Sequence, residues 1–215
     1  MNRPAKLLVT GGTGNVGGQL YRLLRATGRD VRLVVRNPGH PSLPADADIV
    51  VADLDQPNSI ATAAACVQSV FLLGGRRDMP GLLAELRVAG VEHVVLLTSR
   101  SVIGRVPGNA IADMWATSEA ALLASGLSWT IVRPSGFMSN VLRWLPQLRA
   151  GSLVRASFAD AQIAAIDTDD IAAVAAAALT DRAFASSSSA NCFHHPSWMR
   201  CSASSSGASS MTPTS

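Results

Sequence analysis

Several features are scarce in this sequence, and each scarcity excludes a class of protein. The 215 residues include only three cysteines, and Cys66 alone lies in the regularly patterned part, so no disulfide framework is expected. Arginines and acids are interspersed, and the net charge of +3 forms no basic stripe, which argues against a nucleic-acid partner. Apolar runs such as Ile171–Leu179 are too short to span a bilayer, and the N-terminus lacks an apolar signal region. We therefore expect a soluble cytoplasmic protein with no membrane partner.

Glycines, in contrast, are concentrated near the start of the chain. Lys6–Thr10 predicts a strand, and three glycines spaced three residues apart follow it, directly before a helical pattern. Gly11 permits the tight strand-to-helix turn, Gly14 lets the backbone approach a pyrophosphate, and Gly17 lets the helix pack on the strand. The unpaired N–H groups and the dipole of the helix favour phosphate there. A tight turn that binds nothing is the alternative, but the strand–glycine–helix context predicts a dinucleotide site.

Short apolar runs alternate with helical patterns along the first 184 residues, and the 48% hydrophobic content suffices for one core. The expected strands are Lys6–Thr10, Val31–Val35, Asp48–Ala52, Val70–Leu73, His93–Thr98, Ser128–Arg133 and Gln162–Ile166. The expected helices are Asn15–Ala26, Asn58–Cys66, Pro80–Ala89, Ala110–Ala124, Met138–Arg149 and Asp169–Leu179. This alternation predicts an α/β fold with a doubly wound, Rossmann-like parallel sheet. Ligands of such sheets bind beyond the carboxyl ends of the strands, where we expect the glycine segment, Arg36, Asp53, Gly74 and Ser99.

The sequence changes character from Ala185 onward. Residues 185–215 contain 12 serines, one charged residue and no apolar period, which predicts a disordered tail after a dinucleotide-binding domain at 1–184. A metal site is the alternative, although the spacing of its candidate ligands matches no ordinary zinc pattern. Those candidates are Cys192, His194, His195 and Cys201. A further interpretation is a non-native tail from a shifted reading frame, and 17 arginines against one lysine are consistent with a GC-rich gene.

Two polar residues at strand ends bear on the choice of cofactor. Arg36 lies about twenty residues after the glycines, where an NAD-binding fold places an acid for the ribose 2′-hydroxyl. An arginine there offers charged, potentially bidentate hydrogen bonds to a 2′-phosphate, so we expect NADP(H) to be preferred over NAD(H). The alternative for Arg36 is a solvated surface side chain. Asp53 either accepts a hydrogen bond from the adenine amino group or caps a turn, and the sequence leaves both roles open.

The same segments resemble the NmrA-like family of atypical short-chain dehydrogenase/reductase relatives, which includes NAD(P)H-binding quinone reductases and redox-sensing regulators. The resemblance runs from residue 4 to about 182 and is most specific in Thr10–Gly17 and in Thr130–Asn140; Val35–Pro38 and Ala52–Leu54 match as well. It implies that pyrophosphate is held by Gly11, Thr13, Gly14, Asn15 and Val16. It also implies that Arg36 holds the 2′-phosphate, that the Pro134–Phe137 backbone lies near the nicotinamide, and that Leu73, Gly74 and Thr98 line the cofactor. Asp53 and Leu54 are further candidate cofactor contacts.

The acid/base residues depart from those of active short-chain dehydrogenases. Those enzymes use a Tyr-x-x-x-Lys pair, in which the lysine lowers the pKa of the tyrosine so that the phenol exchanges a proton with substrate. This chain has a single tyrosine, Tyr21, and a single lysine, Lys6, both near the first strand and helix. With Glu119 aligned to the family's common glutamate, Ile111 and Trp115 occupy the positions of the pair. The resemblance therefore identifies no catalytic residue.

A second departure lies at the C-terminus. Relatives continue past Asp167–Ala172 into elements that complete the substrate side, so we expect the C-terminal substrate subdomain to be incomplete here. The acids of Asp167–Asp170 are favourable at a helix N-terminus and predict that a helix begins there.

Two functions of different classes remain open at this point. The first is an NADPH-dependent oxidoreductase that passes hydride to a small acceptor such as a quinone or an enone, with a proton from water or substrate. Ser99 or Ser101 is a candidate for polarising a carbonyl, although a serine at a strand end is more often a local cap. The second is a non-catalytic NADP(H) redox sensor that acts through a protein partner. The family resemblance favours the reductase.

Overall fold

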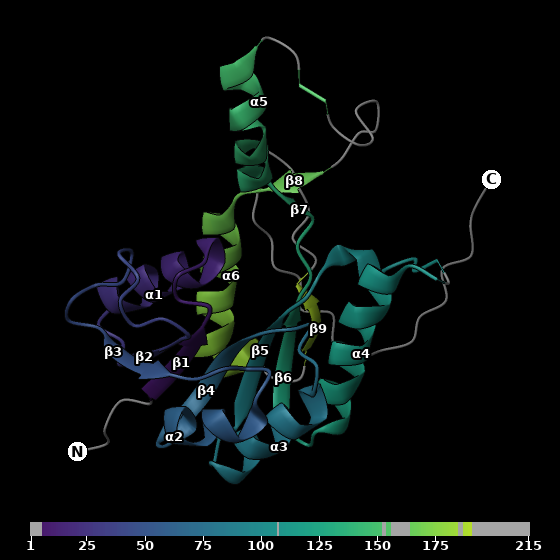
Figure 1. The fold of residues 1–215 in the computed structure, drawn as a ribbon. Helices are drawn as coiled ribbons and strands as arrows, with labels where there is room; N and C mark the ends of the chain where they lie inside the picture. The colour runs from purple at the N-terminus through teal and green to yellow at the C-terminus, as the bar shows by residue number, and fades with distance from the viewer. Residues whose placement is uncertain (1–5, 107, 152–153, 156–163, 185–186, 191–215) are drawn as a thin grey trace.

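Seven parallel strands form the centre of the molecule (Figure 1). The computed structural model describes residues 6–106, 108–151, 154–155, 164–184 and 187–190, so the candidate metal ligands of the tail lie outside the described residues. The strands are β1 (Lys6–Thr10), β2 (Val31–Val35), β3 (Asp48–Val51), β4 (Val67–Leu73), β5 (His93–Leu97), β6 (Ser128–Val132) and β9 (Ser187–Ala190). Their order is β3-β2-β1-β4-β5-β6-β9, and it reverses between β1 and β4. The Rossmann-like prediction is confirmed.

Helices cover both faces of the sheet, because successive side chains of each strand point to opposite sides. Leu7 and Val9 of β1 pack with α1 (Asn15–Ala26) and α6 (Thr168–Thr180), whereas Leu8 between them packs on the other face. That face is covered by α2 (Ile60–Ala64), α3 (Met79–Val88) and α4 (Ala110–Ala124). Within the described part of the chain, no helix is long and apolar enough to cross a membrane.

A short arm projects from the carboxyl edge of the sheet, the edge at which the strands end. It contains β7 (Gly136–Phe137), η3 (Met138–Trp144) and α5 (Leu145–Ala150), and β7 pairs in parallel with β8 (Ala165–Ile166). Figure 1 shows α5 standing above the body of the molecule. The short helices η1 (Pro57–Ser59), η2 (Arg100–Val102) and η4 (Arg182–Phe184) complete the described elements.

Two predicted helices differ from the observed ones by more than a shift of their end residues. The helix expected over Asn58–Cys66 consists of η1 and α2, and it ends before Cys66, whose φ of 63° is left-handed and incompatible with a continuing α-helix. The helix expected over Met138–Arg149 is divided into η3 and α5, with Pro146 in the first turn of α5. Proline is tolerated in a first turn but not inside a helix, which accounts for this division.

A short strand lies near the start of the serine-rich segment. Ser187–Ala190 form β9 and pair in parallel with Thr130 and Val132 of β6. The preceding chain is held to the same strand, since the Thr130 hydroxyl donates a hydrogen bond of 2.6 Å to the Phe184 carbonyl. The unpaired backbone edge of β6 explains why a segment without an apolar pattern forms a strand here.

Candidate functional site: the carboxyl edge of the sheet

The glycine loop between β1 and α1 is shaped by backbone contacts. Gly11 has a φ of 68°, and the Gly14 N–H donates a hydrogen bond of 2.8 Å to the Gly11 carbonyl, which closes the turn. A Cβ on Gly17 would overlap that same carbonyl, so only glycine lets α1 pack this closely. Gly14 itself is exposed, and a Cβ there would lie 3.2 Å from the Gly11 carbonyl oxygen, which is a close contact. The turn at Gly11 and the close packing at Gly17 have the steric form that the spacing predicts. The approach of a pyrophosphate at Gly14 stays a prediction.

The N-terminus of α1 is left open to a ligand. Its N-cap residue is Gly14, so no side chain accepts hydrogen bonds from the first-turn N–H groups, and no acid lies in that turn. Helices α3, α4 and α6 are instead capped by the side chains of Asp78, Asn109 and Asp167, respectively. Unsatisfied N–H groups and a positive dipole end make the start of α1 suited to an anion. Val16 lies in this turn, but its side chain is buried in the core, so it offers only its backbone.

The loop is fixed at the point where the strand order reverses. The Thr10 hydroxyl donates to the Phe71 carbonyl at 2.9 Å and accepts from the Leu73 N–H at 3.2 Å, joining the carboxyl ends of β1 and β4. Leu73 packs directly against Gly11, where a Cβ would come within 2.7 Å of its Cδ1. A switch in strand order is where open α/β sheets bind ligands.

A small cavity of about 150 Å³ opens beside this junction and brings together six of the predicted residues. They are Gly11, Thr13, Arg36, Asp53, Leu54 and Leu73. Arg36 is exposed and forms no ion pair with a described residue. Asp53 caps a turn, since its Oδ1 accepts from the Asp55 N–H at 3.1 Å, and it also lines the cavity. The two roles left open for Asp53 are therefore compatible.

Arg76 also lines the small cavity, and the sequence analysis missed it. Its Nε donates to the Gly74 carbonyl at 3.3 Å, and its Nη1 lies 3.8 Å from Asp55 Oδ2. The sequence does contain a signal for Arg76, because this residue comes directly after the Gly74–Gly75 pair that follows β4. Like Arg36 after β2, Arg76 follows a strand at the carboxyl edge of the sheet, where ligands of such sheets bind.

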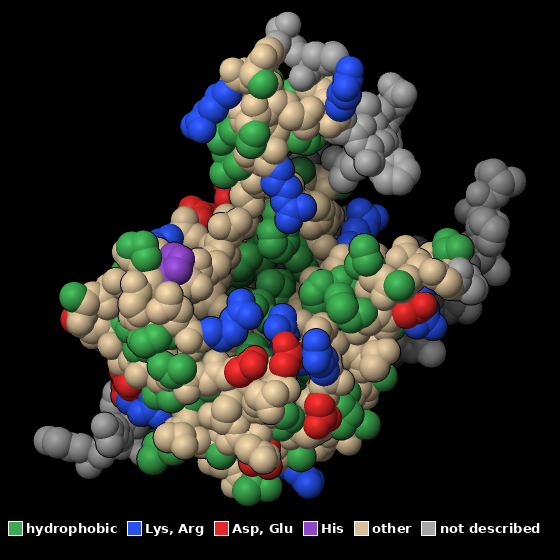
Figure 2. Space-filling model, viewed as in Figure 1, with side chains coloured by type: hydrophobic (Ala, Val, Ile, Leu, Met, Phe, Trp, Pro, Cys, Tyr) green, Lys and Arg blue, Asp and Glu red, His purple; other side chains and the backbone are tan. Residues whose placement is uncertain are grey.

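A large cavity of about 950 Å³ lies on the other side of the loop, between α4 and the arm. Asn15 and Thr98 are the predicted cofactor residues that line it; Ser99, Arg100, Ser101, Ile111, Trp115, Pro134, Ser135, Gly136, Phe137, Asn140, Arg143 and Ala164 complete the lining. Gly74 lies behind Trp115, whose ring carbons would be 3.2 Å from a Cβ at that glycine. Figure 2 shows this region as a hollow lined by hydrophobic side chains.

A hydrogen bond connects the glycine loop to the arm. Asn15 Nδ2 donates to Ser139 Oγ at 3.1 Å, and both residues line a groove of about 280 Å³ along the outer side of the loop together with Thr13 and Gly14. The glycine loop thus borders the small cavity, the large cavity and this groove. Thr13 lines both the small cavity and the groove, and Asn15 lines both the groove and the large cavity.

Beneath the large cavity, a buried network holds α4 to the ends of β5 and β6. Arg133 donates two hydrogen bonds to the Glu119 carboxylate, at 2.8 and 2.7 Å, and the Thr98 hydroxyl donates a third at 2.8 Å. Glu119 is 5% exposed. A two-pronged arginine–carboxylate pair fixes orientation as well as distance, so this network sets the position of Trp115 on α4.

No phenol or ammonium group faces the large cavity among the described residues. Ile111 and Trp115 line it at the positions of the missing pair. Tyr21 lies on the buried face of α1, and this burial raises the pKa of its phenol. Lys6 Nζ is bound instead to Asp48 at 2.8 Å and to Asp30 at 3.5 Å, at the amino end of the sheet.

The two candidate serines have different surroundings. Ser99 Oγ accepts from the Ser101 N–H at 3.2 Å, so it is a local cap. The Ser101 hydroxyl is the one buried side-chain polar atom without a hydrogen-bond partner among the described residues. A buried hydroxyl in that state is destabilising by about 1–3 kcal/mol, and a ligand atom would relieve this.

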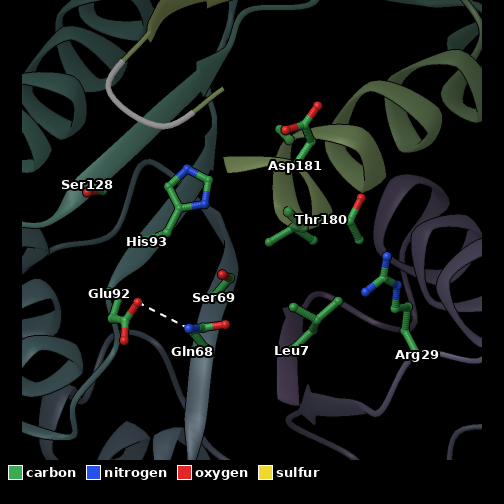
Figure 3. A pocket seen from close by; sticks show the side chains of 11 residues that line it. Leu7, Arg29, Gln68, Ser69, Glu92, His93, Ser128, Thr180 and Asp181 are labelled. Atoms are coloured by element: carbon green, nitrogen blue, oxygen red, sulfur yellow. Dashed lines mark hydrogen bonds between the residues drawn. The ribbon is translucent and has the colours of Figure 1, made fainter. Parts of the chain in front are cut away.

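A further cavity of about 170 Å³ lies at the opposite, amino end of the strands (Figure 3). Leu7, Ser69, His93 and Ser128 line it, and Gln68 there donates to Glu92 at 3.1 Å. None of the predicted site residues lies in it, and the helix end that borders it, at Thr180, is a C-terminus. The carboxyl edge is therefore the candidate site.

Comparison with known proteins gives the family. Residues 11–182 match the family described as NAD(P)H-binding. The chain is 35% identical over 178 residues to the (4-alkanoyl-5-oxo-2,5-dihydrofuran-3-yl)methyl phosphate reductase of Streptomyces griseus, a match that covers 81% of this chain and 63% of the relative. It is 31% identical over 183 residues to the NAD(P)H azoreductase of Xenophilus azovorans, with the same 81% and 63% coverage.

The fold is shared with a solved structure as well. The NADPH-dependent quinone oxidoreductase of Escherichia coli, complexed with NADPH, aligns with a TM-score of 0.71 and 22% identity over 85% of this chain and 68% of that one. The present chain spans 63% of the length of the two curated relatives. The chain belongs to the NAD(P)H-binding family, and its sequence resembles the NmrA-like, atypical short-chain dehydrogenase/reductase proteins.

Proposed function

We propose that the carboxyl edge binds NADP(H) in preference to NAD(H), and that the protein reduces a small conjugated acceptor, such as a quinone or an enone. The observation that carries this proposal is the uncapped, glycine-lined start of α1, which lies between the small cavity with Arg36 and the large apolar cavity. The quinone oxidoreductase and azoreductase activities named for the similar proteins support the reaction class.

The residues of the glycine loop fit a pyrophosphate. In this assignment the pyrophosphate is held by the backbone of Gly11, Thr13, Gly14, Asn15 and Val16. Arg36 holds the 2′-phosphate through charge-assisted hydrogen bonds, and the second carboxylate oxygen of Asp53 accepts from the adenine. Leu54, Leu73, Gly74 and Thr98 line the remaining path of the cofactor.

The large cavity fits a flat acceptor that needs no protein acid. A reduced nicotinamide, when bound, would supply a hydride, and the conversion of a quinone to a hydroquinone needs one proton in addition, which water would provide. Trp115, Ile111 and Phe137 offer apolar surface to a planar ring. Because the cavity opens to solvent, water supplies the proton without a tyrosine.

The test measures NADPH consumption with 1,4-naphthoquinone and, for comparison, with the simple ketone cyclohexanone. Quinone turnover is expected, whereas the ketone, which needs a proton donor, should react about 10²–10⁴-fold more slowly than with a relative that has the Tyr–Lys pair. Parallel titrations with NADPH and NADP⁺ measure cofactor binding. Redox-selective binding without any turnover would overturn the reductase in favour of a sensor. Brisk ketone reduction that is lost in Ser99→Ala or Ser101→Ala would reveal a proton donor among these serines.

A further inference from the structure

Resting on the proposed function, we propose that the large cavity selects conjugated acceptors that carry an anionic group, such as a sulfonate or a carboxylate, and that Arg100 and Arg143 bind this group. This proposal follows from the side chains around the cavity, which include apolar surfaces and two arginines.

The lining of the large cavity combines apolar side chains with uncharged polar ones, and the described lining contains no acid. Trp115 and Ile111 come from α4, and Pro134 and Phe137 come from the segment that enters the arm. Aromatic and aliphatic surfaces of this kind bind a flat conjugated ring system. The lining's two charged side chains are Arg100 and Arg143, both positive.

Both arginines are exposed and lack a counter-ion among the described residues. Neither Arg100 nor Arg143 forms a side-chain hydrogen bond or an ion pair there. Nearby arginines are neutralised: Arg105 lies 3.3 Å from Asp113, and Arg133 is paired with Glu119. Arg100 and Arg143 therefore bring positive charge to the cavity lining that no described acid neutralises.

The backbone at Arg100 is held in place by a hydrogen bond. The Arg100 N–H donates a hydrogen bond of 2.9 Å to the Pro134 carbonyl, which joins η2 to the start of the arm. Arg143 lies on η3 within the arm. In Figure 2, Lys or Arg side chains appear at the rim of the apolar hollow. A planar guanidinium at the mouth of an apolar cavity pairs well with a sulfonate or carboxylate and steers anions toward it.

The experiment compares 1,4-naphthoquinone-2-sulfonate with uncharged 1,4-naphthoquinone, using the full chain. Isothermal titration calorimetry in the presence of NADP⁺ measures binding, and NADPH oxidation measures KM and kcat. The variants are Arg100→Gln, Arg143→Gln and the double variant, with Arg149→Gln on α5 as the matched exposed arginine that does not line the cavity.

We expect the sulfonate to bind the parent protein more tightly than the neutral quinone, and to lose about tenfold in affinity in the double variant. Arg149→Gln should leave the affinities for both quinones within twofold of the parent's. Adding 0.5 M NaCl should lower the affinity for the sulfonate and leave that for the neutral quinone unchanged. Equal affinity of the parent for both quinones, or an unchanged sulfonate affinity in the double variant, overturns the inference. If neither quinone is reduced, the proposed function fails, while the calorimetric comparison still decides whether the arginines select an anion.

Discussion

At the scale of single residues, two arginines define the small cavity. Arg36 follows β2 and Arg76 follows β4, so they come from the two strands that flank β1. Arg76 is partly engaged by the Gly74 carbonyl and by Asp55, whereas Arg36 is exposed without an ion pair among the described residues. Arg36 is therefore the side chain whose charge is available to a 2′-phosphate.

Arg36→Ala should remove most of the preference for NADPH over NADH. A hydrogen bond to a charged group contributes roughly 1.5–3 kcal/mol, which corresponds to about a tenfold to hundredfold loss of NADPH affinity, while NADH affinity stays nearly constant. Calorimetric titration of both nucleotides measures this, with Arg87→Ala on α3 as the control. Equal affinities for NADPH and NADH in the parent protein would rule out this role of Arg36.

At the scale of elements, the Glu119 network determines where α4 lies relative to β5 and β6. Glu119→Ala leaves the Arg133 guanidinium, 16% exposed, without its partner, and breaking such a buried pair is destabilising by about 3–5 kcal/mol. We expect a lower unfolding midpoint in urea. The double variant Glu119→Leu, Arg133→Met removes both charges and should lose much less stability. A single variant as stable as the parent would show that the pair does not hold α4.

The edge formed by β1, β2 and β3 gives a pH-dependent prediction. Burial acts to raise the pKa of Asp48, but hydrogen bonds from Lys6 and Arg32 outweigh it and hold the pKa below 3.8. The resulting stability is present above the unfolded pKa of about 3.9 and is lost as pH falls through the lower folded pKa. The Asp48→Asn variant should therefore have a lower free energy of unfolding than the parent at pH 7. Its free energy of unfolding should also fall less than the parent's between pH 5 and pH 3.

Urea unfolding over this pH range tests the Asp48 prediction. Asp46→Asn is the control, because Asp46 is 75% exposed and its ion pair with Arg25 is long, at 3.4 Å. Identical pH profiles for the parent and Asp48→Asn would contradict the assignment.

Elements with unbroken patterns were predictable from sequence, and those that depend on distant partners were not. The bounds of Lys6–Thr10, Asn15–Ala26 and Ala110–Ala124 are observed as expected, because each segment has a continuous apolar pattern and a local start signal. β9 was missed because its formation depends on the free edge of β6, which no local pattern reveals. The large cavity likewise depends on α4 meeting the arm, about twenty residues away along the chain.

At the scale of the whole molecule, the sheet separates the cofactor side from the tail. β9 lies at the far edge, three strands beyond β4, and the proposed cofactor path lies between β1 and β4. A chain that ends at Ala190 should melt at the same temperature as the full chain, since all seven strands remain. A chain that ends at Phe184 should melt several degrees lower, because β6 becomes an exposed edge. NADPH affinity should be unchanged in both. A melting temperature equal to the parent's for the shorter chain would show that β9 adds no stability.

The central claim is that the open start of α1 holds the pyrophosphate of NADP(H). Titration of Gly14→Val with NADPH tests it most directly, because the exposed Gly14 lies outside the core and a branched side chain there would occupy the phosphate position. Gly151→Val, at an exposed extended position with no neighbouring atom, is the matched control. We predict that Gly14→Val keeps the circular dichroism and melting behaviour of the parent but binds no NADPH. Normal NADPH affinity in a folded Gly14→Val protein would contradict the account.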